Sequence, residues 1–369
     1  MSEATDMKLM RRALALARKG IGRTSPNPAV GCIIVKDGTI IGEGWHRKAG
    51  SPHAEIHALN MAADAARGAD VDVTLEPCCH TGVTPPCTDA LVKAGVRRVV
   101  AGMRDPNPRV SGGGLVALNQ AGIETVCGVL ESDCRAINRP FIKHSESGLP
   151  YVTYKCAMTL DGKIASITGE SRWISCQESR KYVHRMRARN DAVMVGVDTI
   201  LADNPQLTVR HVKGRNPVRI IVDSSLRTPT SVEILSGLMA RNTIIACTEE
   251  DLSLHQRYLL NGATVLVCSS HEGRVDLRDL LEKLGRLGVQ SILLEGGSRL
   301  AGDALTRGLI DECVFFYAPK VIGSDGFSPF AITGITDMSQ SVTFSDLSVR
   351  RIGSDIVVSA RPEGPCLPA

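Results

Sequence analysis

Two short stretches in the first quarter of the chain combine residue types that bind a metal ion and move protons. The first is Pro52-His53-Ala54-Glu55, and the second runs from Glu76 to Cys87 and contains Cys78. One histidine and two cysteines hold a zinc ion with a fourth position open to water, which is the arrangement of a catalytic rather than a structural site. Water held there loses a proton near neutral pH. A carboxylate that is close to the metal without binding it must then shuttle protons, and Glu55 is placed for that role.

The local sequence supports a site of this kind. Ser51-Pro52 is a helix-start signal, so the histidine and the glutamate are expected in the first turn of a helix. Cys87 follows two prolines and also opens a predicted helix, whose N-terminus favours a thiolate. A His-x-Glu motif followed by Pro-Cys is typical of zinc deaminases. The spacing between the cysteines is longer than the usual Cys-x-x-Cys, so Cys79 and His80 remain alternatives for the third ligand.

These residues lie in a segment that alternates between helices and strands. Residues 31–36, the turn Asp37-Gly38 and residues 39–42 form a predicted hairpin with a type I′ turn. Other periodic segments surround this hairpin; we expect helices at 7–18, 54–66 and 89–94, and strands at 71–76 and 97–102. Such alternation predicts a mixed sheet with helices packed on it.

A polar, turn-rich stretch from Ser145 to Pro150 is typical of a domain boundary. At 369 residues the chain is long enough for two domains, which we place at residues 1–147 and 148–369. Beyond the boundary, apolar strands recur with helices between several of them; these strands begin at residues 151, 192, 218, 243, 264 and 291. The pattern predicts a second α/β domain.

The composition limits the classes of function. Hydrophobic residues make up 43% and charged residues 22% of the chain, as in a globular protein. The sequence has neither a membrane-spanning apolar run nor a signal peptide, so we expect a cytoplasmic location. A net charge of +4 with only 4% aromatic residues suits a small anionic substrate better than nucleic acid. Most of the 12 cysteines lie in apolar runs, where we expect them to pack in the core.

The second domain carries weaker chemical signals. It has no Gly-x-Gly-x-x-Gly motif after a strand, so the Rossmann fingerprint is absent. Instead, Leu294-Glu295-Gly296-Gly297 ends a predicted strand before a helix, and such a turn can hold a cofactor phosphate on its backbone N–H groups. A Gly-Gly pair is more often only a tight turn. Arg187 and Arg210 could pair with a substrate phosphate, although isolated arginines are more often solvated.

Several longer motifs together carry a family resemblance. They are Ser25-Pro-Asn-Pro-Ala-Val-Gly-Cys32, Thr74-Leu-Glu-Pro-Cys-Cys-His-Thr-Gly-Val-Thr-Pro-Pro-Cys87, Lys155-Cys-Ala-Met-Thr-Leu-Asp-Gly-Lys-Ile-Ala165, Gly169-Glu-Ser-Arg-Trp-Ile-Ser175 and Leu201-Ala-Asp-Asn-Pro-Gln-Leu-Thr-Val-Arg210. In this order, and over nearly the whole chain, they resemble the bifunctional riboflavin-synthesis family, in which a pyrimidine deaminase is fused to a reductase. The resemblance implies a cytidine-deaminase-like three-layer α/β/α domain followed by a dihydrofolate-reductase-like α/β domain.

For the first domain, the resemblance implies one zinc ion, held by His53, Cys78 and Cys87, with Glu55 as the proton shuttle. The substrate would be 2,5-diamino-6-ribosylamino-4(3H)-pyrimidinone 5′-phosphate, whose exocyclic amine is exchanged for oxygen.

The resemblance also implies residues that bind this substrate. Asn27 and His46 would line the pyrimidine pocket, and His80 would lie near the substrate's phosphate side. Family members usually carry Lys or Arg where Val83 stands in this sequence. Since valine cannot pair with a phosphate, we expect Val83 to affect substrate affinity rather than the zinc chemistry.

For the second domain, the resemblance implies that NADPH reduces the opened ribose of the deaminated product at C1′, giving a ribitylamino chain. Residues that would contact the ribosyl phosphate substrate are Ser171, Arg187, Asp203, Leu207, Arg210 and Glu295. Residues that would lie toward the nicotinamide cofactor are Lys155, Trp173, Ser175, Thr199, Gly296 and Gly297. Asp203 is a candidate donor of the accompanying proton.

Three alternatives stay open from the sequence. A nucleic-acid deaminase shares the zinc pattern, although this chain lacks a basic cluster. A binding or scaffold protein with a structural zinc would need a fourth ligand, which Cys79 or His80 could supply. A deaminase with a degenerate reductase domain would fail to bind NADPH. Edge strands in the second domain favour a homo-oligomer, either a dimer or a tetramer.

Overall fold

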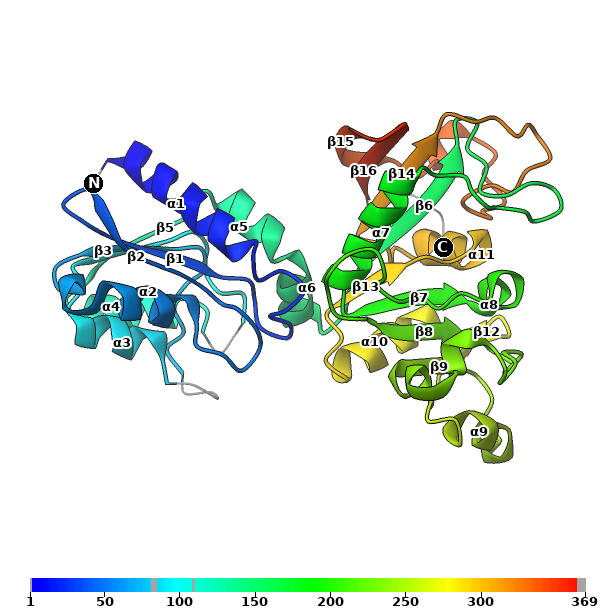
Figure 1. The fold of residues 1–369 in the computed structure, drawn as a ribbon, viewed down its shortest axis with the longest axis horizontal. Coiled ribbons are helices and arrows are strands. Elements are labelled where there is room, and N and C mark those ends of the chain that lie inside the picture. The colour runs from blue at the N-terminus through cyan, green and yellow to red at the C-terminus, as the bar shows by residue number, and fades with distance from the viewer. Residues whose placement is uncertain (1, 81–84, 108–109, 364–369) are drawn as a thin grey trace. The chain divides into compact units, whose positions relative to one another are not determined.

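The computed structural model describes residues 2–80, 85–107 and 110–363. The chain divides into two compact units, Met1–Gly148 and Leu149–Ala369, each with its own sheet (Figure 1). The first unit ends in α6 (Arg139–Ser147), and Gly148 terminates this helix with a left-handed φ of +73°. The stretch from Ser145 to Pro150 was expected to be turn-rich, but its first three residues form the last turn of α6. Serine and glutamate are tolerated there, and glycine supplies the stop.

A five-stranded mixed sheet organises the first unit, with strand order β2-β1-β3-β4-β5. β1 pairs antiparallel with β2 and β3, while β3, β4 and β5 are parallel. The strands are β1 (Gly31–Lys36), β2 (Thr39–Trp45), β3 (Asp70–Val73), β4 (Arg98–Ala101) and β5 (Glu124–Cys127). Between β1 and β2, Asp37 and Gly38 have φ values of +50° and +76°, as the predicted type I′ turn requires.

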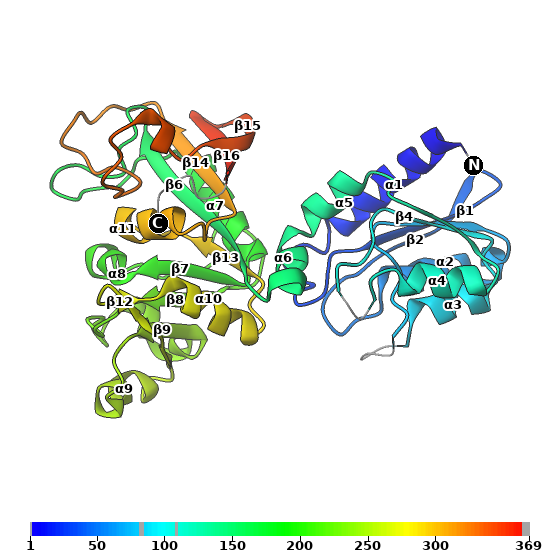
Figure 2. The same ribbon diagram turned by 180° about the vertical axis from the view of Figure 1, so that it is seen from behind.

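Helices cover both faces of this sheet, which confirms the predicted three-layer architecture. Figures 1 and 2 show α1 and α5 on one face and α2, α3 and α4 on the other. The helices are α1 (Glu3–Ala17), α2 (Ala54–Ala62), α3 (Cys87–Ala94), α4 (Gly113–Gln120) and α5 (Glu131–Ile137). The helix expected at 54–66 ends early, because its last turn is a 3₁₀ helix, Ala63–Ala66.

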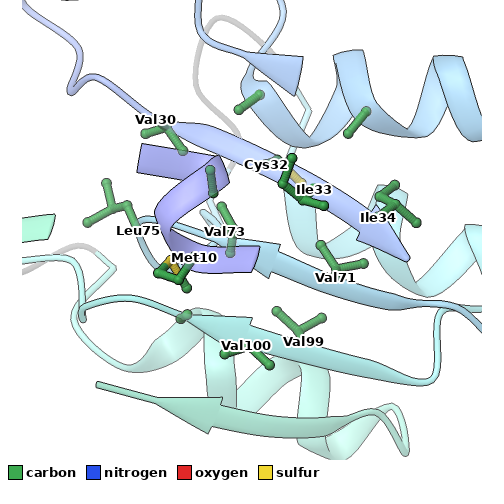
Figure 3. Close-up of a cluster of buried hydrophobic side chains, with 14 of the residues drawn as sticks. Met10, Val30, Cys32, Ile33, Ile34, Val71, Val73, Leu75, Val99 and Val100 are labelled. Atoms are coloured by element: carbon green, nitrogen blue, oxygen red, sulfur yellow. The ribbon is translucent and has the colours of Figure 1, made fainter. Parts of the chain in front are cut away.

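The core of the first unit fills both sides of the central strands. Cys32, Ile33 and Ile34 are consecutive on β1 and all fully buried, because helices cover both faces. Figure 3 shows side chains of β1, β3, β4 and α1 in one cluster. Cys32 behaves as a small hydrophobic residue, as expected, and burial raises the pKa of its thiol.

A nine-stranded sheet organises the second unit, with strand order β10-β9-β8-β7-β13-β6-β14-β16-β15. Six of these strands were expected from the sequence: β6 (Tyr151–Thr159), β7 (Ala192–Gly196), β8 (Val218–Val222), β9 (Thr243–Cys247), β10 (Thr264–Val267) and β13 (Ser291–Leu294). Three were not: β14 (Glu312–Ala318), β15 (Phe344–Ile352) and β16 (Asp355–Pro362). Outside this sheet, β11 (Ser270–His271) and β12 (Arg274–Val275) form a small hairpin.

Five helices accompany this sheet: α7 (Gln177–Arg189), α8 (Val197–Asp203), α9 (Leu252–Leu259), α10 (Leu277–Arg286) and α11 (Ser298–Thr306). The neighbours β6, β13, β7 and β8 are all parallel, so their carboxyl ends meet at one edge. Ligands bind at this edge in open α/β sheets. Within the described ranges, the structure has no helix that is long and apolar enough to cross a membrane.

Candidate active sites

His53, Cys78 and Cys87 come together at the N-terminal ends of two helices. His53 is the N-cap of α2, and Cys87 is the first residue of α3. Cys78 lies in the loop that follows β3. The ligand atoms of the three residues all lie within 4.8 Å of one another. One nitrogen and two sulfur atoms at this separation suit zinc, which prefers such ligands in tetrahedral sites.

Hydrogen bonds link the three side chains. The Nδ1 atom of His53 lies 3.2 Å from the Sγ atom of Cys87 and 3.6 Å from that of Cys78. The backbone N–H of Cys87 also donates to Cys78 Sγ at 3.4 Å. Hydrogen bonds from Cys87 and His53 lower the pKa of the Cys78 thiol to about 4. A thiolate at this position is the form that binds a metal.

The group of metal-binding atoms has three members among the described residues, and neither Cys79 nor His80 belongs to it. Both had been alternatives for the third ligand. His80 instead lines the neighbouring cavity. A set of three ligands leaves a position for water, whereas a structural zinc site is closed by a fourth ligand. Val83, which departs from the family pattern, lies outside the described residues.

A cavity of about 390 Å³ opens beside these ligands. It is lined by all the predicted deaminase residues except the buried Cys87, namely Asn27, His46, His53, Glu55, Cys78 and His80. Glu55 is only 4% exposed, and burial raises the pKa of its carboxyl group. A raised pKa suits a group that must hold a proton and release it near neutral pH.

His46 is held in one orientation by two neighbours. Its Nδ1 lies 3.1 Å from the carbonyl oxygen of Pro52, and its Nε2 lies 3.2 Å from the side-chain nitrogen of Asn27. This pattern fits a neutral ring that donates from Nδ1 and accepts at Nε2. Burial lowers the pKa of His46, and nearby His53 acts in the same direction. The ring is therefore neutral in the pocket wall at physiological pH.

The second unit has a larger cavity, of about 560 Å³, at the carboxyl edge of its parallel strands. Every reductase residue predicted from the sequence lines it: Lys155, Ser171, Trp173, Ser175, Arg187, Thr199, Asp203, Leu207, Arg210, Glu295, Gly296 and Gly297. These residues come from β6, α7, α8, the end of β13 and the loops between them. The fold thus gathers residues that are up to 142 positions apart, from Lys155 to Gly297, around one cavity.

The cations of this cavity differ in their partners. Arg187 is bonded to Glu295, and Arg172 reaches the backbone and carboxylate of Asp203. Arg210 instead contacts the neutral side chain of Gln206 at 3.0 Å. Arg180 contacts the carbonyl of Ser175 and lies over the Trp173 ring at 4.6 Å. Arg210 and Arg180 thus keep more of their charge available for an anionic ligand.

The charged or titratable cavity residues that were missed from the sequence include His184, Arg180 and Arg172. The Nδ1 atom of His184 accepts the backbone N–H of Arg210 at 3.2 Å, which ties the Arg210 loop to α7. Burial, together with the charge of Arg187, lowers the pKa of His184 to about 4, so the ring stays neutral. The sequence signal for His184 was its position three residues before Arg187, because that spacing places two side chains on one face of a helix.

The glycine turn leads directly into α11, with Gly297 as its N-cap. The first N–H groups of a helix lack partners within it and attract anions. A Cβ atom on Gly296 would lie 3.0 Å from the Leu300 side chain, so the turn packs closely against its own helix.

A third cavity, of about 260 Å³, adjoins the 560 Å³ cavity, and Asp198 lines both of them. Arg227, Arg274 and Arg299 also line this third cavity.

Comparisons with known proteins find relatives of both units. The family model "Cytidine and deoxycytidylate deaminase zinc-binding region" matches residues 3–103, and "RibD C-terminal domain" matches residues 150–358. The riboflavin biosynthesis protein RibD of Actinobacillus pleuropneumoniae is 45% identical over 355 residues, covering 96% of this chain and 94% of that protein. The chain belongs to the RibD family. RibD of Escherichia coli is 42% identical, with 95% of this chain and 98% of that protein covered.

Solved RibD structures share the whole fold. Acinetobacter baumannii RibD has a TM-score of 0.90 at 38% identity and covers 98% of this chain and 100% of its own. A Thermotoga maritima deaminase/reductase has a TM-score of 0.86 at 36% identity and covers 98% and 99%. As a RibD-family member, the chain is a bifunctional enzyme of riboflavin biosynthesis, with a zinc-dependent deaminase domain and an NADPH-dependent reductase domain. The expected family, fold and cofactors are therefore confirmed.

Proposed function

We propose that deamination takes place in the 390 Å³ cavity, with His53, Cys78 and Cys87 as the zinc ligands and 2,5-diamino-6-ribosylamino-4(3H)-pyrimidinone 5′-phosphate as the substrate. The observation that carries this proposal is a buried carboxyl group, Glu55, in a cavity that is also lined by His53 and Cys78, two of the three convergent metal ligands. The Thermotoga relative is named as a deaminase of a diaminohydroxyphosphoribosylaminopyrimidine, which supports the same substrate class.

The residues divide the work of deamination. Zinc, when bound, lowers the pKa of a coordinated water. Glu55 takes a proton from the attacking water and delivers it to the leaving amino nitrogen, which departs as ammonia. Asn27 and neutral His46, linked to each other at 3.2 Å, hold the pyrimidine edge. His80 lies toward the substrate's phosphate.

We propose that the 560 Å³ cavity binds the deaminated product together with NADPH, which supplies a hydride to C1′ of the opened ribose. Arg210 pairs with the substrate phosphate, and Arg187 with Glu295 forms the wall beneath it. Ser171, Leu207 and Asp203 complete the substrate side, and Asp203 is the candidate proton donor.

The cofactor side of the same cavity is formed by the remaining predicted residues: Lys155, Trp173, Ser175, Thr199, Gly296 and Gly297. The adjoining 260 Å³ cavity suits the 2′-phosphate at the adenosine end of NADPH, because three arginines line it. Arg227 and Arg299 both face Asp198, at 2.8 and 3.9 Å. Arg227→Gln should weaken binding of 2′,5′-ADP about fivefold and leave binding of 5′-AMP unchanged. Equal loss for both nucleotides would contradict a role in reading the 2′-phosphate.

We also propose a cytoplasmic homo-oligomer, a dimer or a tetramer, that acts on small molecules rather than on nucleic acid or membranes. β15 is the edge strand of the large sheet, and Leu347 and Val349 on it are 64% and 68% exposed. An exposed apolar edge favours pairing with another chain. Light scattering after gel filtration tests this proposal, and a monomer at micromolar concentration would overturn it. RNA affinity that falls steeply with salt would contradict the choice of substrate class.

One assay tests both reactions together. The diaminopyrimidine ribosyl phosphate is supplied with NADPH, and ammonia release and NADPH oxidation are followed in the same sample. Ammonia should appear first, and NADPH consumption should follow it. Ammonia without NADPH oxidation would contradict the reductase assignment. If neither appears although zinc is bound, Val83→Lys is the next variant to assay, because the missing basic residue is the departure from the family pattern.

A further inference from the structure

Glu76 is a buried carboxylate that none of the steps above uses. It is 2% exposed and lies directly before Pro77 and the metal ligand Cys78. None of the ion pairs among the described residues involves it. It accepts four backbone N–H groups instead. Oε2 accepts from Asp105 at 3.1 Å and from Gly112 at 2.9 Å, and Oε1 accepts from Gly114 at 2.9 Å and from Leu115 at 3.1 Å.

Three of these donors belong to the start of α4. Gly112 is the N-cap of this helix and has no side chain with which to cap it. Glu76 therefore caps the helix from a distant loop, and its negative charge lies at the positive end of the helix dipole. The approach is close. A Cβ atom on Gly114 would lie 2.0 Å from the carbonyl oxygen of Pro77, so only glycine fits there.

The fourth donor, Asp105, connects this cap to the deaminase cavity. Asp105, Asn107 and Val110 all line the cavity. In the sequence they lie between the two points that Glu76 binds, the N–H of Asp105 and the start of α4. Within this wall, the Asn107 N–H donates to Asp105 Oδ1 at 2.8 Å. The Val110 N–H donates to the carbonyl of Asn107, also at 2.8 Å. Glu76, which precedes Pro77 and Cys78, is thus hydrogen-bonded to both ends of this wall.

We infer that Glu76 is a positioning residue for deamination, which fixes the wall formed by Asp105, Asn107 and Val110 at a set distance from the metal ligand Cys78. The inference rests on the proposal that deamination occurs in this cavity. Glu76 itself lines the cavity, but backbone N–H groups occupy both of its carboxylate oxygens, so its role is to hold these groups rather than to bind the metal. It sets how well the pocket fits the pyrimidine, while the zinc ligands and Glu55 carry out the reaction.

Glu76→Gln tests the role with little change in shape. The amide nitrogen cannot accept a hydrogen bond, so two of the four N–H groups lose their acceptor and face another donor. The KM for deamination should rise about tenfold, with a smaller fall in kcat. Zinc content should stay at one ion per chain, and reduction of the deaminated product should be unchanged. Glu76→Asp keeps the charge on a shorter side chain and should recover part of the lost affinity.

The matched control is Asp72→Asn, because Asp72 is a fully buried carboxyl in the same unit that does not line the cavity. Its KM should equal that of the wild type. A wild-type KM in Glu76→Gln would overturn the inference, and so would a loss of zinc and kcat with KM unchanged. If Glu76→Gln does not accumulate as folded protein, Glu76→Asp carries the test, and a wild-type KM there would overturn the inference as well. Normal deamination by Glu55→Gln would instead contradict the assignment of the cavity itself.

Discussion

Arg187 of α7 and Glu295 at the end of β13 form a paired wall of the reductase cavity, although 108 positions separate them in the sequence. Two hydrogen bonds of 2.6 and 2.9 Å join them, and their side chains are only 12% and 10% exposed. Burial opposes ionisation of both groups. Their mutual attraction is stronger, so the pKa of Glu295 is lowered and that of Arg187 is raised. The pair therefore stays charged.

Glu295→Gln should leave Arg187 buried without its counter-charge. Removing one partner of such a pair costs about 3–5 kcal/mol of unfolding free energy, and the KM for the reductase substrate should rise. Urea unfolding of the second unit and steady-state reduction measure the two effects. Glu282→Gln is the control, since Glu282 forms an exposed pair with Arg286 at 3.7 Å, and it should cost less than about 0.5 kcal/mol. Equal losses of unfolding free energy in the two variants would show that the burial of the Arg187–Glu295 pair does not determine its contribution to stability.

Glu55→Gln should retain zinc and lose ammonia release. The amide cannot hold or deliver a proton, and positioned acid–base groups contribute about 10²- to 10⁴-fold to a rate. Ammonia release by the purified variant, together with its zinc content by atomic spectroscopy, checks the prediction. Reduction of the deaminated product is the internal control and should not change. Wild-type deamination would rule out Glu55 as the proton shuttle.

Zinc removal should separate the two activities. A chelator should abolish deamination, because His53, Cys78 and Cys87 supply the only metal-binding group found in the described parts of the chain. Reduction of the deaminated product should persist, and far-UV circular dichroism should change little, since a catalytic metal is not needed to hold the sheet. Unfolding of the first unit on zinc loss would favour the structural-zinc alternative instead.

Asp72 should make the stability of the first unit depend on pH. Neither of its carboxylate oxygens has a hydrogen-bond partner. Burial, and then the charge of Asp6, raises its pKa from 3.8 to about 7, although Arg98 opposes the shift. Because the folded-state pKa is the higher one, the folded state binds the proton more tightly than the unfolded state does. Stability is therefore lost as pH rises from about 4 to about 7, by at most about 4 kcal/mol.

Asp72→Asn removes this titration. The variant should match the wild type near pH 4 and exceed it in unfolding free energy at pH 8. Urea unfolding at both pH values, followed by the fluorescence of Trp45 in a Trp173→Phe background, provides the measurement. A stability gain that is the same at pH 4 and pH 8 would mean that Asp72 does not titrate in this range.

Much of the deaminase site could be predicted from the sequence, because its chemistry lies in two short motifs. His53 and Glu55 are two residues apart, and both metal-binding helix starts carry a proline signal just before them. The longer spacing between Cys78 and Cys87 left the third ligand open. Only the three-dimensional distances separate Cys87 from Cys79 and His80.

The role of Glu76 could not be predicted in the same way. Its partners are backbone N–H groups 29 to 39 positions later in the chain, and backbone groups leave no trace in residue type. Similarly, β14 was not expected, yet it pairs in parallel with β6 over seven residues, from Glu312 to Ala318. Long-range pairing of this kind follows from the packing of the whole sheet rather than from local pattern.

Among the described residues, the lining of each of the two cavities comes from a single unit. The lining of the deaminase cavity spans Pro26 to Phe141, and that of the reductase cavity spans Tyr154 to Phe327. The peptide link at Gly148 and Leu149 therefore contributes no residue to either cavity. What the link does fix is stoichiometry. Every translated chain delivers one deaminase and one reductase, so the cell cannot accumulate the capacity to make the deaminated intermediate without equal numbers of sites to consume it.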